Sequence, residues 1–129
     1  MGLFGFGAKA SVDKSVVGFL KDVDVVYTKA LLVKQPAMLE KYMTRSCLIK
    51  QAEKIRVGER AYAGLERYKH VTWKHVSSEA TTFVYNKEVT YDDIKMSHGI
   101  VVPVGDSCNE RWTVILEDDK YKVSEIRRL

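Results

Sequence analysis

The sequence predicts an α+β domain in which N-terminal helices pack on a curved antiparallel sheet of four to five strands. Apolar residues recur at helical spacing through the first half of the chain and alternate with a period of two through the second half. This order, helices first and strands afterwards, is typical of the α+β class. The length of 129 residues is enough for one domain with a hydrophobic core and too short for two.

The first twelve residues differ in composition from the rest, and we expect one domain over residues 13–129. The stretch MGLFGFGAKA is rich in glycine, places Phe4 and Phe6 between glycines, and predicts a flexible apolar arm over residues 1–12. Phe6 stands where an N-myristoylation signal needs Ser or Thr, so lipidation at Gly2 is disfavoured. We expect the arm to tuck its rings against the domain; the alternative is a shallow contact of Phe4 and Phe6 with a membrane or a partner.

Two helices are expected next. The first should begin at a cap formed by Ser11 or Asp13 and end at Gln35-Pro36; its apolar stripe comprises Val16, Phe19, Leu20, Val23, Val26, Tyr27, Ala30 and Leu31. Pro36 suits the first turn of the second helix, which Gly58 can end; its apolar face comprises Leu39, Tyr42, Met43, Leu48, Ile49, Ala52 and Ile55. A short helical or irregular piece is expected around Ala61–Leu65.

The strands are predicted by alternation. RYKHVTWKHVSS places Val71, Trp73 and His75 on one face of a strand. The next stretch, TTFVYNKEVTY, aligns Phe83, Tyr85, Lys87, Val89 and Tyr91. A third stretch, IKMSHGIVVPV, aligns Met96, His98, Ile100, Val102 and Val104, and Pro103 marks an edge or the end of that strand.

The last twenty residues predict a hairpin that turns at Asp118-Asp119. If Glu117 pairs with Lys120 across this turn, the register of the whole hairpin follows. The expected pairs are then Leu116 with Tyr121, Val114 with Val123, Trp112 with Glu125, and Glu110 with Arg127. One face of the hairpin is therefore an apolar ladder with a charged rim, and the other is expected to be wetter, with Arg111, Thr113, Ile115, Lys122 and Ser124.

Composition excludes several classes of protein. There is no run of about 18 apolar residues and no recognisable signal peptide, so we expect a cytoplasmic protein. The two cysteines, Cys47 and Cys108, do not form a disulfide framework, and free thiols are expected. Residues 1–78 carry 14 basic and 7 acidic side chains, but the bases stand singly and indicate a solvated helix face. Nucleic-acid binding is therefore not predicted.

The hairpin pattern E-x-W-x-V…Y-x-V-x-x-I resembles the cystatin-like cone of the nuclear transport factor 2-like superfamily. The pattern is carried by Glu110, Trp112, Val114, Tyr121, Val123 and Ile126, and the stretch LEKYMTRSCLIKQ adds to the resemblance. Within the superfamily the chain looks closest to the branch of the mitochondrial import-scaffold domain. The resemblance implies a sheet wrapped around the first helix, with a conical cavity between them.

Members of this superfamily include isomerases, dehydratases, hydrolases, cyclases and non-catalytic binding domains, so the fold does not choose a function. The enzymes place Asp in the cone, whereas the strand faces assigned above put no Asp on a core-facing position. This departure argues against carrying over isomerase or hydrolase chemistry. We predict no cofactor and no metal, because His75, His98 and Glu110 lie on different strands at no spacing that brings them together.

The candidate ligand-binding residues are the polar and aromatic side chains assigned to the cone and its rim: Tyr42, Trp73, His75, Tyr85, His98, Glu110, Trp112, Glu125 and Arg127. Rim salt bridges and ordinary core packing remain the alternatives for these residues, as they do for the aromatic group that Tyr42 forms with Tyr62, Tyr68 and Trp73.

The predicted function is the non-catalytic binding of a small ligand, apolar or of mixed polarity, or of a protein partner. A homodimer through the outer sheet face is expected, because Ile115 and Ile126 are assigned to that face. One alternative is a small lyase or isomerase with His98 as general base, assisted by Tyr85 or Glu110. Another is a membrane-peripheral assembly factor that uses Phe4 and Phe6.

Overall fold

A computed structural model describes residues 2–57, 69–95, 97–99, 101–102 and 108–129, with residues 2–10, 94, 101–102 and 108 described by their backbone alone. The helical elements are α1 (Gly2–Val33), the 3-10 helix η1 (Pro36–Leu39) and α2 (Arg45–Arg56). The strands are β1 (Lys69–Glu79), β2 (Thr82–Tyr91), β3 (Ile94–Lys95), β4 (Val101–Val102), β5 (Cys108–Glu117) and β6 (Lys120–Arg128). The predicted α+β arrangement, helices packed on an antiparallel sheet, is confirmed.

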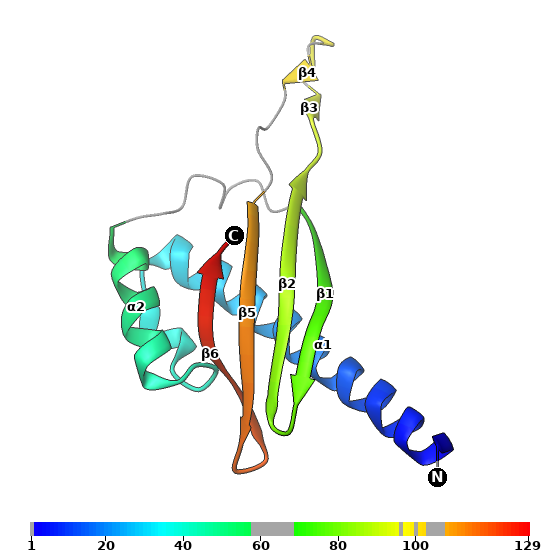
Figure 1. Ribbon diagram of the computed structural model, residues 1–129. Coiled ribbons are helices and arrows are strands. Elements are labelled where there is room, and N and C mark those ends of the chain that lie inside the picture. Colours follow the sequence, from blue (N-terminus) through cyan, green and yellow to red (C-terminus); the bar gives the residue numbers. More distant parts are fainter. Residues whose placement is uncertain (1, 58–68, 96, 100, 103–107) are drawn as a thin grey trace.

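The main sheet has four antiparallel strands in the order β1-β2-β5-β6. Helix α1 crosses one face of this sheet, and α2 lies beside the edge strand β6 (Figure 1). No element among the described residues covers the opposite face, which we call the outer face (Figure 1). The outer face carries polar contacts, such as the hydrogen bond from Arg111 Nε to Asn86 Oδ1 at 3.0 Å.

Helix α1 begins earlier than predicted. It is continuous from Gly2, through the residues expected to form an arm and past the expected caps at Ser11 and Asp13. Its end agrees with the prediction: Lys34 has a positive φ of 54°, and the Gln35 amide donates to the Ala30 carbonyl oxygen at 3.0 Å. This pattern is the Schellman motif that commonly ends helices.

The expected single helix from Pro36 to Gly58 is wrong, because η1 and α2 are separate. The chain between them pairs with the edge of β6: Thr44 N–H donates to Val123 O at 3.0 Å, and Val123 N–H donates to Tyr42 O at 2.8 Å. Thr44 then caps α2, since its side chain accepts a hydrogen bond from the Cys47 amide at 3.4 Å. The predicted end at Gly58 and the piece at 61–65 lie outside the described residues.

The third predicted strand is instead a small hairpin. β3 pairs with β4 in a separate two-stranded sheet that projects past one end of the main sheet (Figure 1). Residues 97–99 form its turn, where Gly99 has a φ of 88° that glycine adopts without strain. His98 therefore lies exposed on a turn, and the prediction that it faces the core is wrong. Met96, Ile100, Pro103 and Val104 lie outside the described residues.

The closing hairpin follows the predicted register only near its turn. Leu116 pairs with Tyr121 and Val114 with Val123, but the register then shifts by one residue. Ser124 is the extra residue, a β-bulge, so that Trp112 pairs with Ile126 and Glu110 pairs with Arg128. The predicted pairs of Trp112 with Glu125 and of Glu110 with Arg127 are therefore wrong. The bulge also turns Ile126 towards the core, away from the outer face to which it was assigned.

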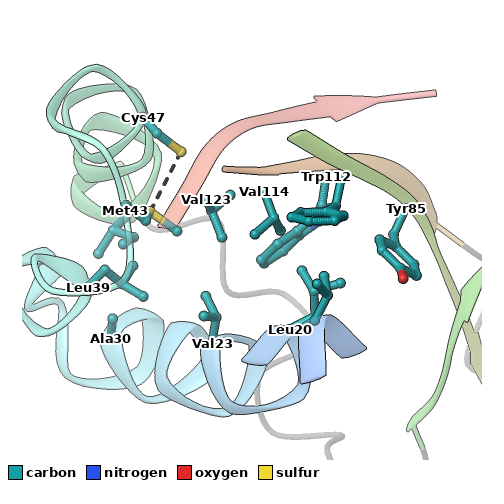
Figure 2. Close-up of a cluster of buried hydrophobic side chains, with 13 residues drawn as sticks. Leu20, Val23, Ala30, Leu39, Met43, Cys47, Tyr85, Trp112, Val114 and Val123 are labelled. Carbon is teal, nitrogen blue, oxygen red and sulfur yellow. Dashed lines mark hydrogen bonds between the residues drawn. The ribbon is translucent and has the colours of Figure 1, made fainter. Parts of the chain in front are cut away.

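The core fills the space between α1, η1, α2 and the inner face of the sheet. Its largest fully buried side chains are Trp112, Tyr85, Leu20, Leu39, Met43, Ile55, Val16, Val23, Val114 and Val123. In Figure 2, Val23 and Leu20 of α1 point towards Val114, Trp112 and Val123 of the sheet. Burying one such aliphatic side chain contributes roughly 1.5–3 kcal/mol, so this layer holds α1 against the sheet.

Candidate functional site

Two polar regions lie within this apolar architecture. The first lies between α1 and the inner face of the sheet. It comprises four charged side chains, which we call the inner charge cluster: Asp24, Lys69, Lys87 and Glu110. The second is a groove between α2 and β6, lined by Ser46, Cys47, Lys50, Gln51, Ser124, Glu125, Ile126 and Arg127. We call it the α2–β6 groove.

The inner charge cluster is built around Lys87 on β2. The side chain of Lys87 is only 8% exposed, and its Nζ donates a hydrogen bond to Asp24 Oδ1 on α1. Lys69 Nζ on β1 approaches Asp24 Oδ2 at 3.3 Å, and Glu110 Oε1 on β5 lies 4.0 Å from Lys87 Nζ. Two cations thus face two carboxylates, and these ion pairs compensate the desolvation of the charges.

Two tryptophan rings enclose Lys87. Its Nζ lies 5.3 Å from the ring centroid of Trp112 and 5.8 Å from that of Trp73, both within the range of cation–π attraction. The two rings meet edge to face, with centroids 5.2 Å apart. Trp112 Nε1 donates to Glu110 Oε1 at 3.3 Å. Within the described residues, each charge of the cluster therefore has an oppositely charged or hydrogen-bonding partner.

The α2–β6 groove, in contrast, is open. It encloses about 250 Å³, and a neighbouring hollow of about 410 Å³ continues along α2 past Glu53, Lys54 and Val57. Lys50, Gln51 and Ile126 line both hollows, so the two form one continuous depression. The first hollow alone is smaller than a usual small-molecule site, whereas the two together reach the size of one.

Gln51 is a buried polar residue that lines this groove. The residue is 3% exposed, and its Oε1 accepts a hydrogen bond from the Tyr27 hydroxyl at 2.7 Å. Its side-chain nitrogen has no hydrogen-bond partner among the described residues. Because no side-chain nitrogen or oxygen described here is both fully enclosed and unpartnered, this nitrogen must reach the surface of the groove. Its two donors therefore face the groove, where water or a ligand can accept hydrogen bonds from them.

The charges at the groove are also unpaired. Lys50 and Arg127 line it together with Glu125, and within the described part of the chain none of the three makes an ion pair. Lys54 and Glu53 stand further along α2. Every charge of the inner cluster has a partner, whereas the charges of the groove are available to a ligand.

Cys47 lies at the base of the groove but is not a nucleophile. Burial raises the pKa of its thiol to about 11, against a partly compensating attraction from Lys50. The thiol therefore stays protonated at neutral pH, and its Sγ lies 3.7 Å from Met43 Sδ, the contact drawn in Figure 2. The groove supplies hydrogen-bond donors and charge, and its thiol is inert.

The structure divides the predicted ligand-binding residues among several places. Trp73, Glu110 and Trp112 belong to the inner charge cluster or its walls, and Glu125 and Arg127 line the α2–β6 groove. Tyr42 is half-buried, with its ring 6.3 Å from that of Phe19, and lines neither region. His98 lies on the exposed turn between β3 and β4, outside both regions. The nine residues therefore do not form one site, although the inner face brings five of them together: Trp73, His75, Tyr85, Glu110 and Trp112.

Tyr85 and His75 form a third contact on the inner face. Their rings meet edge to face at 5.3 Å, and His75 is exposed, with Nε2 2.6 Å from Ser78 Oγ. The Tyr85 hydroxyl donates to Asp13 Oδ1 of α1. Burial and this hydrogen bond raise the pKa of Tyr85 above its usual range. Tyr85 therefore anchors α1 to the sheet in its neutral form.

Sequence reasoning missed Asp24, Lys69, Lys50 and Gln51. Asp24 lies between Leu20 and Tyr27 at helical spacing, so its position on the core-facing stripe was the available signal. The predicted absence of a core-facing Asp applied to the strands alone, whereas Asp24 lies on α1. Gln51 shares the buried face of α2 with Cys47 and Ile55 and could have been found in the same way.

The comparisons with known proteins do not identify the chain. No protein-family model matches the sequence, and no significant match to a curated protein exists. Among the described residues, no helix is long and apolar enough to cross a bilayer. The same residues contain no group of three or more His, Cys, Asp or Glu side chains that could hold a metal ion.

Proposed function

We propose that this chain is a non-catalytic small-molecule-binding domain of the nuclear transport factor 2-like type, and that its ligand occupies the α2–β6 groove. The single observation that carries the proposal is Gln51. Its amide is buried and held by Tyr27 at one end, and presents its other end to an open groove. A positioned polar group within a partly apolar hollow is typical of a small-molecule site.

The groove supports binding better than catalysis. Its sulfur is kept in the thiol form, and Glu125 is exposed and forms no ion pair with a described residue. The lyase alternative depended on a core-facing His98, and the exposed turn removes that premise. The membrane-contact alternative depends on the side chains of Phe4 and Phe6, and the structure describes these two residues by their backbone alone. Homodimerisation through the polar outer face remains a prediction.

The proposal can be tested by screening a small fragment library against the isotope-labelled full chain by two-dimensional NMR. We expect one or more fragments to shift the Gln51 side-chain NH₂ signals together with the backbone signals of Ser124 and Ile126. Fragments that shift only signals outside the groove, or no fragment that shifts any of these signals, would contradict the proposal.

A matched pair of variants sharpens the test. Gln51→Met keeps the volume of the side chain but removes its donors, and should weaken fragment binding at least tenfold. Gln35→Met makes the same change at an exposed position just beyond α1 and should leave binding unchanged. If Gln51→Met fails to fold, the mapping on the unmodified chain still decides the question.

A further inference from the structure

Resting on the function proposed above, we infer that the ligand of the α2–β6 groove carries a single carboxylate, bound between Lys50, Arg127 and the Gln51 amide, with an apolar body along Ile126 and Val57. The inference names a ligand class, which the binding proposal leaves open. Three independent features of the groove support it.

The first feature is the balance of charge. Lys50, Lys54 and Arg127 line the two hollows against Glu53 and Glu125, which leaves one positive charge in excess. None of the three cations forms an ion pair with any described residue. An unpaired lysine and arginine on one small depression favour a ligand with an anionic group.

The second feature is the set of neutral donors. The Gln51 side-chain nitrogen can donate two hydrogen bonds into the groove, and a carboxylate accepts through both of its oxygens. The hydroxyl of Ser46 lies on the same wall.

The third feature limits the charge of the ligand. Glu125 lines the groove beside Arg127 and would repel a second negative charge. Ile126 and Val57, together with the stem of Lys54, give the continuation of the groove an apolar wall. A monocarboxylate with a hydrocarbon body satisfies both the charged end and the apolar end, whereas a phosphate dianion is opposed by Glu125.

The test compares, on the full chain, probes that share a phenylpropyl body and differ in their head group. 4-Phenylbutyrate, 4-phenylbutyramide and 3-phenylpropyl phosphate are titrated separately at pH 7 in low salt, and binding is followed by the NMR signals of Gln51, Ser124 and Ile126. We expect the carboxylate to bind at least tenfold more tightly than either the amide or the phosphate. Lys50→Met and Arg127→Met should each weaken carboxylate binding about fivefold and leave amide binding unchanged. Lys29→Met, on the exposed side of α1, serves as the control.

The outcomes separate the two proposals. If the amide binds in the groove as tightly as the carboxylate, or the phosphate binds more tightly, the carboxylate inference is overturned while the binding function stands. If all three probes and the fragment library leave the groove signals unmoved, the proposed function itself fails. A carboxylate whose binding is unaffected by both Lys50→Met and Arg127→Met also overturns the inference.

Discussion

The Tyr27 hydroxyl donates to Gln51 Oε1 at 2.7 Å and so joins α1 to α2 across 24 residues of sequence. The Tyr27 ring lies 6.4 Å from that of Trp112, which in turn contacts Lys87 and Glu110. Tyr27 therefore contacts a residue that lines the α2–β6 groove through its hydroxyl, and a residue beside the inner charge cluster through its ring. Its hydroxyl holds the oxygen of the Gln51 amide, which leaves the amide nitrogen for the groove.

Removing the Tyr27 hydroxyl should lower the free energy of unfolding. Tyr27→Phe keeps the ring but leaves Gln51 without its partner, and we expect a loss of about 1 kcal/mol in the free energy of unfolding. Urea unfolding followed by tryptophan fluorescence measures this loss. Tyr42→Phe is the matched control, because the Tyr42 hydroxyl makes no hydrogen bond to a described residue. Equal losses in the two variants would show that the Tyr27 hydrogen bond does not contribute.

The inner charge cluster should be sensitive to the loss of one partner. Lys87→Met removes a buried cation and leaves the Asp24 carboxylate with Lys69 alone, at an expected cost of about 3 kcal/mol. Lys74→Met on the same sheet removes an exposed pair with Glu88 and should cost less than about 1 kcal/mol. Thermal or urea unfolding of both variants gives the comparison. A Lys87→Met variant as stable as Lys74→Met would mean that the cluster contributes no more than a surface ion pair.

Periodicity predicted the elements, and contacts between distant segments decided how they join. The stripe from Val16 to Ala30 and the alternation in β2 follow from local spacing, so the helix and the buried face of the strand could be read from the sequence. The division between η1 and α2 could not, because it depends on Thr44 pairing with Val123, about 80 residues later. Likewise the bulge at Ser124 has no local signal, and it displaced every pair predicted beyond it.

For the candidate site too, the sequence predicts single residues better than the contacts between elements. Glu125 and Arg127 were predicted as ligand-binding residues and do line the groove, but beside α2 rather than over the Trp112 ring. Lys50 and Gln51, which line the groove with them, come from a helix whose position relative to β6 cannot be read from residue spacing. Spacing places a residue on a face of its own element, while the neighbour of that face is set by the packing of the whole core.

Stability should fall at alkaline pH because of Cys47. Its folded pKa, raised by burial from 9.0 to about 11, means that the unfolded chain loses the thiol proton first as the pH rises. The stability that the protonated Cys47 thiol gives the folded chain is fully present below pH 9 and is lost between pH 9 and about 11. Between pH 8 and pH 10 the expected loss from this group is about 1 kcal/mol.

The measurement is the free energy of unfolding in urea at pH 8 and pH 10. Cys47→Ser replaces the thiol by a hydroxyl that does not titrate in this range, so the stability of the variant should change less between the two pH values by about that amount. The comparison uses the change with pH, which cancels the packing cost of the substitution itself. If the two proteins lose the same stability between pH 8 and pH 10, Cys47 is not the group that titrates.

The turn of the closing hairpin offers a stabilising substitution. Asp118 and Asp119 both have positive φ, 52° and 61°, as a two-residue type I′ turn requires. Glycine adopts such a conformation without the steric cost that a side chain brings, so Asp119→Gly should raise the free energy of unfolding by about 0.5–1 kcal/mol. Asp119→Ala keeps a Cβ, loses the local hydrogen bonding that lets aspartate tolerate this region, and should lower it. Thermal unfolding of the two variants tests the sign of each change, and a fall in stability for Asp119→Gly would show that the Asp119 side chain contributes more than its backbone strain costs.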